Sequence, residues 1–180
     1  MKTLWTTTLC LFISFAALAQ SGSRYQTYKS VMTIIASKNG VTEEWKNDRL
    51  SVVLDYKNGD FILKLYNDDF KNTDASGDTP NENRVEYSLQ GIFPINDIID
   101  QKQISQTYDV ELQLVNFESR MNQTLNFEVN VTNPGTSQSQ YRIFILQGSL
   151  YNDEVNLPAF KGYDNEVEIN IAFNGYIVTQ

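Results

Sequence analysis

The stretch SVVLDYKNGDFILKLY, residues 51–66, contains two apolar runs separated by Asn58-Gly59. In the first run Val52, Leu54 and Tyr56 alternate with other residues, which is the side-chain period of a β-strand. Asn-Gly between two such runs is a strong hairpin signal, because Gly supplies the positive φ that a two-residue turn needs. The stretch therefore predicts two antiparallel strands joined by a tight turn.

The same period of two recurs along most of the chain. The predicted strands are 28–37, 49–56, 61–66, 84–93, 108–114, 125–131, 141–150 and 166–173. Most of them have one apolar face and one polar face, which is typical of an antiparallel sheet around a single core. The runs 28–37 and 141–150 are apolar on both faces, so we expect both faces to be covered. Asn39-Gly40 predicts a further turn.

One segment interrupts the strand pattern. In PINDIIDQ, residues 94–101, Pro94 stands at a plausible first turn, and Ile95, Ile98 and Ile99 have helical spacing. We predict a short helix at one end of the sheet. The fold class is therefore all-β and antiparallel, with about eight strands and one short helix. These patterns leave a barrel and a β-sandwich or jelly roll open, because both bury alternating strands.

The N-terminus has the features of a signal peptide. Lys2 is followed by an apolar stretch that ends in Ala17-Leu18-Ala19, the small-x-small pattern of a cleavage site. The stretch is too short for a confident membrane span, so we predict no transmembrane segment. We expect residues 1–19 to be removed, residues 20–180 to form one domain, and the protein to be secreted or periplasmic.

The composition excludes several kinds of chemistry. The chain has no histidine, and its one cysteine, Cys10, lies in the predicted signal peptide, so a Ser-His-Asp triad, a Cys-His pair and the usual zinc sites cannot form. After loss of Lys2, 13 basic residues face 22 acidic ones, a net charge of −9 that excludes nucleic acid as a partner. Adjacent acids such as Glu43 and Glu44 are expected on a wet surface. We predict no enzyme, no cofactor and no metal.

An acidic stretch, NDDFKNTDASGDTPNENR (residues 67–84), raises the question of a cation site. It contains Asp68, Asp69, Asp74, Asp78 and Glu82. Aligned to a calcium-binding loop, it has Asn83 where a bidentate Glu is needed, and no helix flanks it. Its Asn, Asp, Ser, Gly and Pro residues favour turns. We predict a long solvated loop between two strands, with at most weak cation binding.

Three segments carry a resemblance to a known family. They are LDYKNGDFILKLYNDDFKN (54–72), TYDVELQLVNFESRMNQTLNFEVNV (107–131) and YNDEVNLPAFKGYDNEVEINIAF (151–173). The first resembles the LD-x-x-x-G hairpin of the YceI-like family, the second its YxVxGxLxxxG strand and the strand that follows, and the third its closing loop and strand. The chain departs from the family at Leu112, where the family has Gly, and at Asn116-Phe117, where it has His-Gly.

The resemblance implies a lipocalin-like antiparallel barrel, commonly exported to the periplasm, that encloses an amphiphilic lipid, often a polyisoprenoid. It implies a hydrophobic cavity and a binding function without catalysis. Periodicity supplies the residues expected to line that cavity. The predicted lining set is Leu54, Tyr87, Leu89, Phe93, Leu112, Leu114, Phe127, Ile143, Ile145, Ile171 and Phe173.

A second function class stays open beside this one. A β-sandwich module could bind a glycan or a protein through an exposed face of aromatic residues, for which the ten tyrosines and Trp45 are candidates. The two classes differ in the fold and in whether the aromatic residues gather on the surface.

Overall fold

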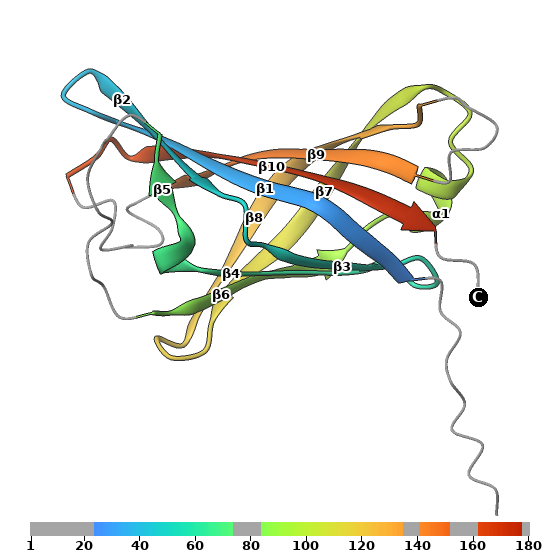
Figure 1. The fold of residues 1–180 in the computed structure, drawn as a ribbon, viewed down its shortest axis with the longest axis horizontal. Coiled ribbons are helices and arrows are strands. Elements are labelled where there is room, and N and C mark those ends of the chain that lie inside the picture. Colours follow the sequence, from blue (N-terminus) through green and yellow to red (C-terminus); the bar gives the residue numbers. More distant parts are fainter. Residues whose placement is uncertain (1–23, 74–83, 135–140, 152–161, 178–180) are drawn as a thin grey trace, which may run out of the picture.

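A computed structural model of the protein describes residues 24–73, 84–134, 141–151 and 162–177 (Figure 1). The predicted signal peptide lies outside the described residues, as do residues 74–83 of the acidic stretch. The described elements are β1 (Arg24–Lys38), β2 (Val41–Asn47), β3 (Ser51–Asp55), β4 (Asp60–Tyr66), the 3-10 helix η1 (Asn67–Asp69), β5 (Lys71–Asn72), β6 (Glu86–Ile92), α1 (Ile95–Ile99), β7 (Ser105–Asn116), β8 (Met121–Thr132), β9 (Tyr141–Tyr151) and β10 (Glu166–Ile177).

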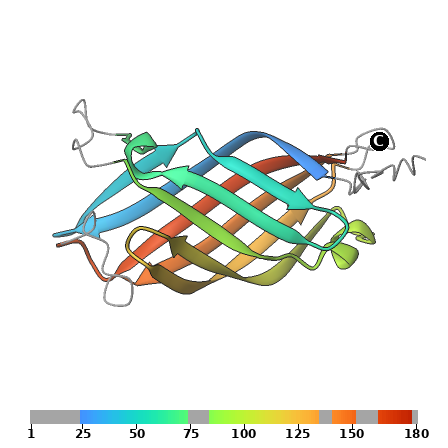
Figure 2. The same ribbon diagram turned by 90° about the horizontal axis from the view of Figure 1, so that it is seen from below.

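The strands form one antiparallel sheet that closes on itself. Their order is β10-β9-β8-β7-β6-β4-β3-β1-β2-β5, and β10 also pairs with β1. Since β1 contacts both β3 and β10, eight strands make a complete ring, and β2 and β5 extend it on one side. Figure 2 shows the oblique strands of this barrel. The barrel is confirmed, and the alternative of a sandwich or jelly roll is wrong because its sheets would not join at both edges.

Two strands were not predicted from the sequence: β2, which lies beside the end of β1, and β5, which lies beside β2. The last part of β1 pairs with β2, from Met32 opposite Asn47 to Lys38 opposite Val41, whereas its first residues pair with β3. Strands β2 and β3 therefore follow one another along the same edge of β1. Asn47 lies at the bend between them, where its amide donates a hydrogen bond of 3.4 Å to the carbonyl oxygen of Tyr66. Strand β5 pairs with β2.

The two predicted turns differ in length. Asn39 and Gly40, with φ of 54° and 77°, connect β1 to β2 as a two-residue hairpin of the type expected for Asn-Gly. The turn between β3 and β4 is longer than predicted, because it spans residues 56–59 between the strand ends Asp55 and Asp60. The amide of Gly59 closes it by donating to the carbonyl oxygen of Asp55 at 2.8 Å.

The two ends of the barrel are built differently. The predicted helix is confirmed as α1, whose buried Ile95 and Ile98 lie at one end, called the α1 end. At the other end, called the β2 end, lie the β1–β2 hairpin, β5 and the hairpin between β7 and β8 (Figure 1).

Candidate functional site

Four phenylalanine rings fill the interior at the α1 end. Phe61, Phe93, Phe144 and Phe173 are each at most 2% exposed and come from β4, the residue after β6, β9 and β10. The rings of Phe61 and Phe93 stack with centroids 4.6 Å apart, and those of Phe144 and Phe173 with centroids 4.7 Å apart. Stacked aromatic rings bury large areas at interior density. Protein side chains therefore occupy this end of the barrel.

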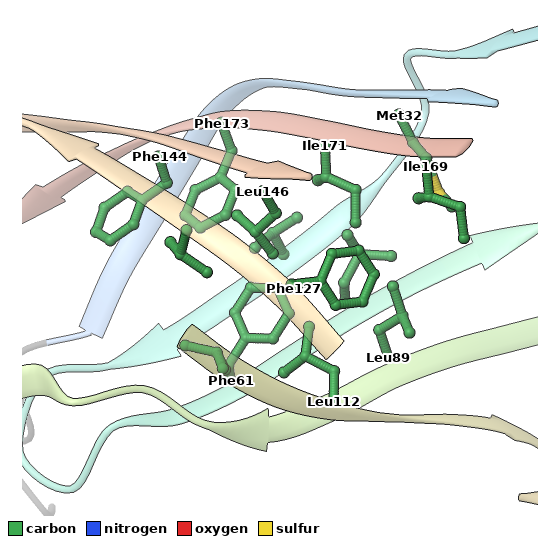
Figure 3. Packing of buried hydrophobic residues seen from close by; sticks show 14 of the residues in the cluster. Met32, Phe61, Leu89, Leu112, Phe127, Phe144, Leu146, Ile169, Ile171 and Phe173 are labelled. Carbon is green, nitrogen blue, oxygen red and sulfur yellow. The ribbon is translucent and has the colours of Figure 1, made fainter. Parts of the chain in front are cut away.

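Aliphatic side chains from opposite walls meet in the middle of the barrel. Figure 3 shows Ile169 and Ile171 of β10 pointing toward Leu89 and Leu112 of β6 and β7. All four are at most 4% exposed. The same buried apolar cluster continues along β1 to Met32, Ile34 and Ala36, which approach the β2 end.

The structure buries most of the predicted lining set. Eight of its members are buried, and Tyr87 is partly buried against the same cluster. Those eight are Leu54, Leu89, Phe93, Leu112, Leu114, Phe127, Ile171 and Phe173. Burial places them in the core. That they contact a ligand stays a prediction.

The prediction that Ile143 and Ile145 point inward is wrong. In β9 the inward residues are Phe144 and Leu146, both 0% exposed, whereas Ile145 is 40% exposed. Ile143 pairs with Thr132, on the face of β8 opposite to the buried Val131. Because residues 141–150 are apolar on both faces, periodicity alone did not identify the inner face. A shift of one residue exchanges the two faces of a strand.

A polar cluster lies at the β2 end, on the inner face of β2. Glu43 pairs with the buried Ala36, and Trp45 pairs with the buried Ile34, so both side chains belong to the inward register. The hydroxyl of Tyr163 donates a hydrogen bond of 3.0 Å to Oε2 of Glu43, and the amide of Asn72 donates to the same oxygen at 3.2 Å. We call Glu43, Trp45, Asn72 and Tyr163 the Glu43 cluster.

Backbone contacts bring Tyr163 to this cluster from the far end of the chain. The amide of Asp164 donates to the carbonyl oxygen of Ser37 at 2.7 Å, which holds residues 162–165 against the end of β1. The Tyr163 ring then meets the edge of Trp45, with centroids 5.4 Å apart and planes at 77°. Both rings pack against the buried core, so the cluster has an apolar inner side and a polar outer side.

Charge is unevenly distributed around the cluster. Burial raises the pKa of the Tyr163 phenol above its ordinary value, and the hydrogen bond to Glu43 and the charge of that carboxylate raise it further. The neutral phenol is therefore the stable form at neutral pH, and it acts as a donor to Glu43. The exposed Lys38 places its ammonium 5.2 Å from the centre of the Tyr163 ring. Glu43 thus supplies the carboxylate of the cluster, from the inward register of β2.

This cluster was not predicted from the sequence, for physical reasons. We expected Glu43 on a wet surface, but its side chain lies in the inward register of β2 and is partly buried. The signal available was Asn39-Gly40 followed by VTEEWKN, in which Val41, Glu43, Trp45 and Asn47 alternate with the outward residues. Because Glu43 and Asn47 are polar, the inner face of β2 lacks the apolar alternation that predicts a strand. No sequence pattern near Tyr163 indicated its contact with this face.

The acidic stretch forms ion pairs where the structure describes it. Arg84 pairs with Asp68 at 2.8 Å and with the buried Asp69 at 3.6 Å, and Asp69 also pairs with Arg49 at 3.4 Å. The side-chain oxygen of Asn67 accepts a hydrogen bond of 2.7 Å from the backbone amide of Val85. This bond joins the first residue of the stretch to the residue that follows its last. The described part is not only a loop, because it contains η1 and β5. Asp74, Asp78 and Glu82 lie outside the described residues.

Within the ranges that the structure describes, no three His, Cys, Asp or Glu residues gather in a way that would hold a metal ion. None of the helices in these ranges combines the length and apolarity needed to cross a membrane.

Comparison with known proteins identifies the fold. A polyisoprenoid binding domain from Saccharophagus degradans, implicated in plant cell wall breakdown, is similar with a TM-score of 0.65 and 12% identity, over 87% of this chain and 99% of that domain. BcnA of Burkholderia cenocepacia has a TM-score of 0.54 and 15% identity, over 81% of this chain and 96% of its own. At these identities the likeness supports a YceI-like fold. No family model and no curated protein matches the sequence.

Proposed function

We propose that this protein binds an amphiphilic lipid with a long acyl or isoprenoid chain, as a carrier or store, without catalysing a reaction. The apolar chain lies along the interior of the barrel, and the head group lies at the β2 end. In this proposal the protein acts outside the cytoplasm, in the periplasm or as a secreted protein, after cleavage that follows Ala19. The signal-like N-terminus supports that location.

The observation that carries the proposal is the difference between the two ends of one apolar barrel. The α1 end is filled by stacked phenyl rings, whereas the apolar lining leads at the β2 end to the Glu43 cluster. An amphiphile needs this order of surfaces, apolar along the chain and polar at the head. Burial contributes about 25 cal/mol per Å² of apolar surface, so a long chain binds without a catalytic group.

The structural neighbours support the same reading. The domain from Saccharophagus degradans is a polyisoprenoid binding domain, and this chain is similar to nearly its full length. The competing proposal, a glycan or protein recognised by an exposed aromatic face, has less support. Among the side chains that the structure describes, the exposed large aromatic residues are Phe117 and Tyr151, which belong to different hairpins or strand ends.

A pair of matched substitutions tests where the chain lies. Ala36 points inward near the β2 end and is 2% exposed, whereas Ala172 lies between the buried Ile171 and Phe173 of β10 and therefore faces outward. Ala36→Phe fills interior space, and Ala172→Phe adds the same ring outside. The affinity of geranylgeraniol is measured by displacement of the neutral dye N-phenyl-1-naphthylamine. It is expected to fall at least tenfold in Ala36→Phe and to stay within twofold of the unmodified protein in Ala172→Phe.

A native mass spectrum provides the independent test. The protein is secreted with its own signal peptide, its mass is measured, and the sample is extracted with organic solvent. A chain that begins at Gln20, with an extractable adduct of a few hundred daltons, supports both the export and the lipid. A bare chain that also gains no mass from a lipid extract overturns the lipid proposal. For the dye-displacement test, far-UV circular dichroism of Ala36→Phe and Ala172→Phe shows whether both variants are folded.

A further inference from the structure

The Glu43 cluster gives the end of the barrel a graded polarity. Along β2 the inward residues, from the strand tip toward the bend, are Glu43, Trp45 and Asn47, and they pair in turn with Ala36, Ile34 and Met32 of β1. A chain lying along β1 would pass the apolar residues first and meet the Glu43 carboxylate last. The head group of an amphiphile held in this way lies beside Glu43.

One oxygen of Glu43 is occupied and the other is available. Oε2 accepts both hydrogen bonds in the cluster, from Tyr163 at 3.0 Å and from Asn72 at 3.2 Å. In the part of the chain that the structure describes, no hydrogen bond reaches Oε1, and no ion pair involves Glu43. The cluster thus offers a free acceptor on a carboxylate that Tyr163 and Asn72 hold in place.

The sign of this charge decides which head groups fit. A carboxylate or phosphate head would lie beside a partly buried carboxylate, and like charges repel more strongly where water is partly excluded. Among the described residues, Lys38 brings a cation to the cluster through its contact with the ring of Tyr163, but Lys38 is exposed, so solvent screens its charge. Glu44, the next residue, belongs to the outward register of β2.

We propose that Glu43 selects the head group of the bound amphiphile: the site takes a head that donates a hydrogen bond and carries no negative charge, such as an alcohol, and rejects a carboxylate or phosphate head. The inference rests on the proposed function and deepens it. Glu43 is a specificity-determining residue that contacts the ligand through Oε1.

The test compares two ligands with the same chain. Geranylgeraniol and geranylgeranoic acid displace N-phenyl-1-naphthylamine from the full-length mature protein at pH 8, where the acid is ionised. The alcohol is expected to bind at least tenfold more tightly, which corresponds to about 1.4 kcal/mol. Glu43→Gln is expected to reduce this ratio to less than threefold. Glu44→Gln removes the same charge from the outward register and is expected to keep the ratio.

The outcomes separate the two proposals. If neither ligand displaces the dye, the lipid-binding function fails and head-group selection fails with it. If both ligands bind equally, or if Glu44→Gln changes the ratio as much as Glu43→Gln does, selection by Glu43 is overturned while lipid binding stands.

Discussion

The hydroxyl of Tyr163 donates a hydrogen bond to Oε2 of Glu43 at 3.0 Å, although 120 positions separate the two residues. The contact joins the segment before β10 to the inner face of β2, across the end of the barrel. The adjoining backbone bond from Asp164 to Ser37 fixes the same segment to β1. The β2 end is therefore held together by polar contacts, whereas the α1 end is held by stacked rings.

Removing the Tyr163 hydroxyl should destabilise the fold while keeping the ring. In Tyr163→Phe the aromatic contact with Trp45 remains, but Glu43 loses one of two donors. A hydrogen bond to a charged group that is partly exposed contributes about 1–2 kcal/mol. Urea unfolding should show a loss of this size. Tyr151→Phe, at an exposed position, is the control and should change stability by less than about 0.5 kcal/mol. Equal effects would contradict a structural role for the contact.

The face assignment of β9 and β10 can be measured with two isoleucines. Ile171 is 0% exposed, so Ile171→Ala should cost about 2–5 kcal/mol of unfolding free energy, the usual range for truncation in a core. Ile145 is 40% exposed on the outer face, so Ile145→Ala should cost less than about 1 kcal/mol. Urea unfolding of both variants provides the measurement. A larger loss at Ile145 than at Ile171 would mean that the inner face of β9 is the one predicted from the sequence.

Strand existence could be predicted from the sequence because most strands have one apolar face. The runs that became β3, β4, β6, β7, β8 and β10 alternate clearly, and the helix at Ile95–Ile99 had the expected spacing. Barrel closure could not be predicted from periodicity, since it depends on the pairing of β1 with β10, whose partners range from Ala36 and Val167 to Tyr25 and Ile177 and lie far apart in sequence. The family resemblance supplied that part of the prediction.

The candidate site was harder to predict, because its residues break the pattern that reveals strands. Glu43 and Asn47 are polar yet lie in the inward register of β2, so the strand did not stand out. Tyr163 reaches Glu43 only through the tertiary fold. For β9 the difficulty was opposite. Ile143, Phe144, Ile145 and Leu146 are all apolar, and the pairing of β9 with β8 and β10 identifies Phe144 and Leu146 as inward.

Gly148 of β9 should not tolerate a methyl group. A Cβ at this position would lie 2.8 Å from the ring of Phe127 and 2.7 Å from the carbonyl oxygen of Asn126. Overpacking of this kind costs about 1–3 kcal/mol, so Gly148→Ala should lower the urea midpoint despite the better strand propensity of Ala. The double variant Gly148→Ala/Phe127→Leu relieves the contact with the ring. A double-mutant cycle should therefore give a favourable coupling above about 0.5 kcal/mol, and simple additivity would show that the ring does not fill this space.

Acid stability should depend on Glu86, on the outer face of β6. Its carboxylate accepts hydrogen bonds from Lys64 and Tyr66, both at 3.0 Å, and these bonds hold the pKa of Glu86 below its ordinary value. A carboxyl group whose pKa is lowered by folding contributes stability above its unfolded pKa of about 4.3, and that contribution is lost as the pH falls through the lower folded pKa. Urea midpoints measured from pH 6 to pH 2 should therefore fall less steeply in Glu86→Gln than in the unmodified protein.

The control is Glu111→Gln. It removes an exposed carboxyl group from β7 that has no ion pair among the described residues, and the urea midpoint should fall with pH as it does in the unmodified protein. If Glu86→Gln also shows the pH dependence of the unmodified protein, the contacts of Glu86 with Lys64 and Tyr66 contribute no more to stability than its contacts with solvent do.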